Sequence, residues 1–90
     1  MDLAPLPGGD LIAKGLADLA RGEETDESLL VSVGAARLTS LGIPVRGAIP
    51  EPEERLYRRL AQASPNAAHS RYNALIRRLV SFARASGCAR

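Results

Sequence analysis

The amino-acid sequence predicts an all-α domain, and three observations lead to this expectation. Alanine and leucine, which are strong helix formers, are frequent, whereas strand-favouring residues are few. Apolar residues recur at helical spacing in several segments. Prolines and glycines gather in short stretches that would separate those segments. We therefore expect a small four- to five-helix domain with a Pro/Gly-rich central connector and a long C-terminal helix.

The length of 90 residues predicts one small domain with a thin core. Only three residues are aromatic, so the core must consist mainly of aliphatic side chains. We expect four parts in this single domain: a flexible arm (1–9), an acidic helical half (10–41), a connector (42–52) and a basic helical hairpin (53–86).

The first helix is expected over LIAKGLADLAR, with Asp10 as its N-cap and Gly22 after its end. Lys14 and Asp18 are spaced as an i, i+4 pair on the side away from the apolar face. Gly15 either weakens this helix by about 1 kcal/mol relative to alanine or permits a close helix approach.

The second element begins near Thr25, which can cap a helix. Leu29, Leu30 and Val33 would form its buried face. The run LLVSV is also compatible with a short strand, so helix and strand both stay open for residues 28–33. Gly34 interrupts the element.

A stop signal follows in AARLTSLGIP. Gly42 can adopt the left-handed conformation after a helix, and Ile43 can then contact Leu38. The connector GIPVRGAIPEP holds three prolines and two glycines, which exclude a regular element. Val45 and Ile49 would be exposed apolar residues in a free connector, so we expect it to dock.

The third helix is expected to start at Pro52, a favourable first residue. Glu51 with Arg55, and Glu54 with Arg58, are spaced as i, i+4 ion pairs.

The last helix is expected to start with Ser64 as N-cap and Pro65 as first residue, and to run to about Ser86. At about 1.5 Å per residue it would be roughly 30 Å long. It carries a wide apolar stripe, in which three residues are expected to carry the core: Leu75, Leu79 and Phe82.

Arginines flank this apolar stripe on both borders. Arg71 and Arg78 lie along one border, and Arg77 and Arg84 along the other. Arginine stems commonly cover the edge of a core while their charged heads stay in water. The remaining arc holds small residues such as Ala74 and Ser81, which would allow another backbone to approach closely.

Charge is divided sharply along the chain. Residues 1–54 hold all ten acids and four bases, a net charge of −6, whereas residues 55–90 hold eight arginines and no acid, a net charge of +8. Such a chain can pair its own halves, pair with a copy of itself, or offer its basic half to a polyanion.

Little in the sequence indicates catalysis. His69 is the only histidine and Cys88 the only cysteine, and neither has partners at catalytic or metal-ligand spacing. We expect no enzyme, metal or cofactor. The segment MDLAPLPGGD lacks the pattern of a signal peptide, and no apolar run is long enough for a membrane span. We therefore expect a cytoplasmic, bacterial protein.

The first functional hypothesis is a non-catalytic, self-associating protein-interaction module of the antitoxin or adaptor kind. It would bind a protein partner, a second copy of the chain, or both. The residues expected to contact the partner lie on the last helix: Ala74, Arg77, Arg78, Ser81 and Arg84.

The alternative is a regulator that binds nucleic acid with its basic half, in the manner of a helix-turn-helix. Two helices joined by a brief turn would place polar side chains against bases and phosphates. The residues expected to do so are Arg58, Arg59, Asn66, Arg71 and Asn73.

Overall fold

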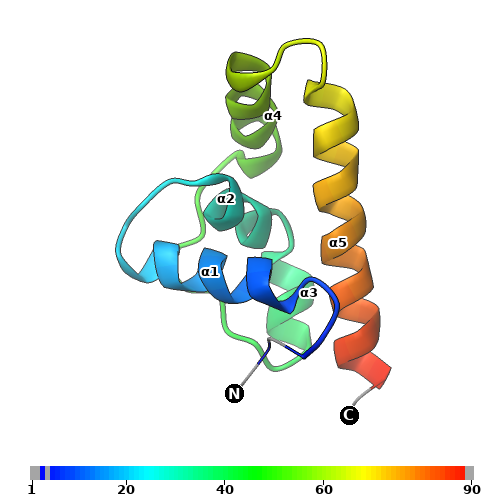
Figure 1. The fold of residues 1–90 in the computed structure, drawn as a ribbon. Coiled ribbons are helices and arrows are strands. Elements are labelled where there is room, and N and C mark those ends of the chain that lie inside the picture. The colour runs from blue at the N-terminus through cyan, green and yellow to red at the C-terminus, as the bar shows by residue number, and fades with distance from the viewer. Residues whose placement is uncertain (1–2, 4, 89–90) are drawn as a thin grey trace.

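The chain is described by a computed structural model that covers residue 3 and residues 5–88. The described residues form five α-helices and no strand, which confirms the all-α prediction (Figure 1). The helices are α1 (Gly9–Ala20), α2 (Asp26–Val33), α3 (Ala35–Ser40), α4 (Pro52–Ala63) and α5 (Ala68–Cys88).

The short helix α2 forms the centre of the molecule. It packs against all four other helices, and Leu29, Leu30 and Val31 are completely buried. Three consecutive buried residues cannot all lie on one helix face, so α2 must be covered on several sides. This explains why LLVSV could also be read as a strand, and the structure decides for a helix.

The long helix α5 runs along one edge of the molecule, and the other helices all lie on the inner side of α5 (Figure 1). Phe82 is completely buried and Leu79 nearly so, whereas Leu75 is half-buried. Together with the central residues of α2, they belong to one continuous apolar core.

A close approach joins α1 to α2 at Gly15. A Cβ atom at this position would clash with the backbone carbonyl oxygen of Glu27 and would lie 2.7 Å from Cγ1 of Val31. Only glycine leaves room for this contact, which confirms the second of the two expectations for Gly15.

Asp18 lies at the same contact and is only 1% exposed, although its sequence position predicted a solvent-facing side chain. Its carboxylate accepts hydrogen bonds from Nζ of Lys14 at 2.7 Å and from Oγ1 of Thr25 at 2.7 Å, and it pairs with Arg21. These bonds hold the pKa of Asp18 below its ordinary value, and the bond from Lys14 has the largest effect. Asp18 is buried because α2 covers it, and it is stable there because its oxygens are paired.

Thr25 caps α2 as predicted. Its hydroxyl accepts from the backbone N–H of Ser28, and the Ser28 hydroxyl accepts from the backbone N–H of Thr25. Because the same Thr25 hydroxyl donates to Asp18, the start of α2 is fixed to α1.

The stop signal after α3 also folds as predicted. Gly42 has a φ of 88°, and the backbone N–H of Ile43 donates to the carbonyl of Leu38 at 2.9 Å. The connector then docks along the body, where the backbone N–H of Ile49 donates to the hydroxyl of Ser32 at 3.0 Å. Val45 and Ile49 are half-buried, which confirms the expected docking.

Several expected boundaries and contacts were wrong. Gly8, not Asp10, is the N-cap of α1, and Asp10 is an exposed residue in its first turn. Ser64 and Pro65 belong to the turn between α4 and α5, because α5 begins only at Ala68, and α5 extends past Gly87.

The two i, i+4 ion pairs expected at α4 do not form. Arg55 pairs with Glu24 instead, at 3.1 Å, and Arg58 forms no ion pair with any described residue. The tertiary fold brings Glu24, in the loop before α2, within ion-pair distance of Arg55, which therefore does not pair with Glu51.

The described part of the expected N-terminal arm lies against the body. Leu3 is buried, and a Cβ atom at Gly8 would lie 2.8 Å from the carbonyl oxygen of Arg78. The arm thus packs on α5; residues 1, 2 and 4 of the expected arm lie outside the described residues.

Replacing Gly15 by alanine tests the close approach. We expect Gly15→Ala to lower the free energy of unfolding by about 1–3 kcal/mol, because the added methyl group forces α1 away from α2. The control is Gly87→Ala, where the added Cβ would lie 3.8 Å from Leu41, an ordinary contact. That variant should match or slightly exceed wild type in urea denaturation. Equal stability of both variants would contradict the packing.

The buried carboxylate predicts a pH dependence. Because the pKa of folded Asp18 lies below its ordinary value of 3.8, its stabilising effect is present above pH 3.8 and is lost as the pH falls through the folded pKa. We expect Asp18→Asn to be less stable than wild type at pH 7 and to lose less stability on acidification. Urea denaturation at pH 7 and pH 3 measures both; an identical acid-induced loss in both proteins would contradict this account.

Candidate interaction surface

Ion pairs join the acidic and basic halves of the chain within one molecule. Arg55 pairs with Glu24, Arg59 with Asp26 at 2.8 Å, and Arg78 with Asp10 at 3.3 Å. These pairs are substantially exposed, so each contributes little to stability. They nevertheless neutralise charge where α4 meets the acidic segment 23–27 and where α5 meets the start of α1.

The outer face of α5 is exposed. In Figure 1 no helix lies on its outer side, and from residue 73 to residue 84 the exposed residues of α5 are Asn73, Ala74, Arg77, Arg78, Val80, Ser81 and Arg84. All five residues expected to contact a partner therefore lie on the surface, but they do not form one cluster. Ala74 and Arg78 line a hollow with Asp26 and Glu27, whereas Arg77, Ser81 and Arg84 point away from those acids.

A groove of about 190 Å³ lies between α3 and α5. Its walls are almost entirely apolar, and Arg37 supplies the only charge. We call this the basic groove, and it is lined by Val33, Gly34, Arg37, Leu38, Leu79, Val80 and Ala83.

Val80 stands at the rim of the basic groove and is 37% exposed. Arg77 precedes it by three residues and Arg84 follows it by four, so both arginines lie beside it on the helix surface. Among the described residues, Arg37, Arg77 and Arg84 form no ion pair. No acid lies near them in the sequence either, because residues 28–50 and all of α5 contain none.

A second groove, of about 580 Å³, lies between α4 and the start of α5. Tyr57 and Tyr72 meet edge to face across it, with their ring centres 5.8 Å apart. Burial raises the pKa of Tyr72, and the negative charge of Glu53 raises it further to a smaller extent. We call this the tyrosine groove, and its lining is Glu53, Glu54, Tyr57, Arg58, Ala61 and Tyr72.

The residues expected to bind nucleic acid lie at the end of the molecule that α4 and α5 share. All five are exposed, but three of them already have partners in the fold: Arg59 bonds to Asp26, Arg71 donates to the hydroxyl of Ser64 at 3.4 Å, and Asn73 lies 3.2 Å from His69. Glu53 and Glu54 line the groove beside Arg58, so this end carries acids that would repel phosphate.

Sequence reasoning missed the exposure of Val80, the position of Arg37 and the tyrosine groove. Val80 falls within the wide apolar stripe of the last helix, where periodicity alone does not separate buried positions from exposed ones. The signal that could have identified it was the width of that stripe, which exceeds what one layer of helices covers. Arg37 and the tyrosine groove depend on contacts between distant segments, which no local pattern reveals.

Comparisons with known proteins give no relative: no family model, no curated protein and no solved structure matches the chain. Within the described residues, no group of three or more histidine, cysteine or acidic side chains is placed to hold a metal ion. No helix in this part of the chain has both the length and the apolar character needed to cross a membrane.

The surface position of the arginines predicts that they are dispensable for folding. We expect Arg77→Glu with Arg84→Glu to change the free energy of unfolding by less than about 1 kcal/mol, because both side chains are exposed and form no ion pair with any described residue. Phe82→Ala, between them on the buried side, should cost about 3–5 kcal/mol. Urea denaturation followed by circular dichroism distinguishes the two; comparable losses would show that the arginines support the core.

Proposed function

We propose that this chain is a non-catalytic protein-interaction module whose binding surface is the basic groove with Arg77 and Arg84 beside it. The observation that carries the proposal is the exposed apolar rim at Val80, surrounded by arginines without a carboxylate partner. An apolar centre with a charged border, in which arginine is frequent, is typical of protein–protein interfaces.

The chemistry of the surface defines its partner. An apolar side chain would enter the basic groove, and carboxylates beside it would pair with Arg37 and Arg84. Hence the partner presents an apolar residue among acids. Nucleic acid suits this surface less well, because protein surfaces that bind it are more polar than protein–protein interfaces and use arginine against phosphate rather than around an apolar groove.

Capture by the purified full chain tests the proposal. The chain is immobilised and exposed to a nuclease-treated lysate of the cells that produce it, and bound proteins are identified by mass spectrometry. We expect Arg77→Glu with Arg84→Glu to lose the proteins that wild type retains. The matched control is Arg59→Glu with Arg71→Glu, which changes the net charge equally at exposed arginines outside both grooves and should retain them. Equal retention by both variants would refute the proposed surface.

Nucleic-acid binding is tested in parallel with a fluorescent duplex of random sequence. We expect that any binding of wild type to the duplex does not depend on Arg58 and Arg71. If wild type binds the duplex with a steep salt dependence and Arg58→Glu with Arg71→Glu abolishes it, several phosphates are being neutralised and the alternative function is correct.

A further inference from the structure

We propose that the partner is a second copy of this chain, bound antiparallel about a two-fold axis near Ile76. The inference rests on the proposed function and names the partner of the same surface. It follows from an apolar stripe that connects the tyrosine groove with the basic groove and from the opposite charges at its two ends.

The stripe runs along α5 through Tyr72, Ile76 and Val80, which are four residues apart and therefore neighbours on the helix surface. Tyr72 and Ile76 are partly exposed, and Val80 is 37% exposed. The stripe spans about 12 Å at the usual helix rise. Tyr57, 41% exposed, extends it onto α4.

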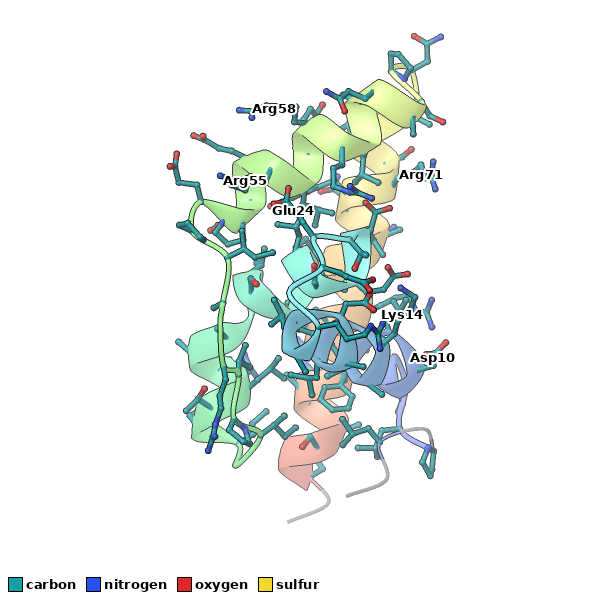
Figure 2. The ribbon with its side chains drawn as sticks, turned by 90° about the vertical axis from the view of Figure 1, so that its left-hand side faces the viewer. Asp10, Lys14, Glu24, Arg55, Arg58 and Arg71 are labelled. Atoms are coloured by element: carbon teal, nitrogen blue, oxygen red, sulfur yellow. The ribbon has the colours of Figure 1, made fainter. Side chains whose placement is uncertain are left out.

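Both grooves lie on the same side of the molecule. Figure 2 shows Arg58, which lines the tyrosine groove, and the helix α3, which lines the basic groove, on one side. Asp10, Lys14 and Arg71 lie on the other side in the same view. A flat partner surface can therefore contact both grooves at once.

The two ends of the stripe carry opposite charges. Glu53 and Glu54, at the tyrosine groove, form no ion pair with any described residue, and Arg58 compensates only one of the two. Arg37 and Arg84, at the basic groove, have no carboxylate partner among the described residues. The stripe is thus negative at one end, apolar in the middle and positive at the other end.

A surface of this kind is complementary to itself. Rotation by 180° about an axis through the middle places Ile76 against its own copy and each negative end on the positive end of the other chain. A parallel arrangement would place like charges together, and a uniformly acidic partner would be repelled by Glu53 and Glu54. Because the two-fold contact is closed, association stops at the dimer.

Sedimentation of the purified full chain over a range of concentrations tests the stoichiometry. The mass should rise to twice the 9.5 kDa of one chain and no further, and salt should weaken the association. A mass that stays at one chain overturns this inference but leaves the proposed function intact if capture of another protein still depends on Arg77 and Arg84. A mass that keeps growing overturns the two-fold geometry.

Two charge variants test the antiparallel pairing. Arg37→Glu with Arg84→Glu makes both ends negative, and Glu53→Arg with Glu54→Arg makes both ends positive. Each alone should dimerise at least about tenfold more weakly than wild type, because like charges meet at both ends. An equal mixture should form dimers with one chain of each kind. A mixture that stays monomeric overturns the proposal, provided circular dichroism shows both variants folded.

Cross-linking tests the position of the axis. In a Cys88→Ser background, Ile76→Cys should form a disulfide-linked dimer on oxidation with diamide, because a residue on the axis meets its own copy. The control is Ala13→Cys, an exposed position on α1 away from the stripe, which should stay unlinked under the same conditions. Equal cross-linking of the two variants overturns the placement of the axis at Ile76.

Discussion

The burial of α2 on several sides is the constraint on which the rest of the structure depends. A helix of eight residues gains little stability from its own hydrogen bonds, so its packing must hold it in place. Gly15 lets α1 approach its backbone, the connector bonds to Ser32, and Asp18 joins its cap to α1. Once α2 occupies the centre, the other helices can only lie around it, and α5 is left at the edge with its outer face uncovered.

The same arrangement determines how charge is distributed on the surface. The acidic loop before α2 lies against α4 and the start of α1 against α5, so Arg55, Arg59 and Arg78 find carboxylates within the chain. The arginines near α3 find none, because no acid occurs between residues 28 and 50. A division that is linear in the sequence becomes a division between paired charges on one side of the folded molecule and unpaired arginines around the basic groove. Apolar residues also remain exposed at the basic groove, which links the electrostatics to the proposed interface.

Much of the site was accessible from the sequence, but not its shape. The wide stripe and the arginines on its borders placed Arg77 and Arg84 on the surface correctly, because helix periodicity alone determines which residues share a face. Arg78 has the same residue type and a similar position, yet it pairs with Asp10, a residue 68 positions away. Local pattern cannot distinguish a paired arginine from an unpaired one, since the partner is supplied by another part of the chain.

The sequence by itself determined the helical class, the cap at Thr25, the stop at Gly42 and the irregular connector, because each depends on the conformational preferences of a few adjacent residues. Only the tertiary structure decided that residues 28–33 are a helix, that Asp18 is buried, and that α5 starts after the Ser64–Pro65 turn. The tyrosine groove and the basic groove also exist only in the tertiary structure, because each is lined by residues of different helices. The physical reason is the same in each case: a short apolar run or a single carboxylate is compatible with several environments, and the free energy of packing against distant segments selects among them.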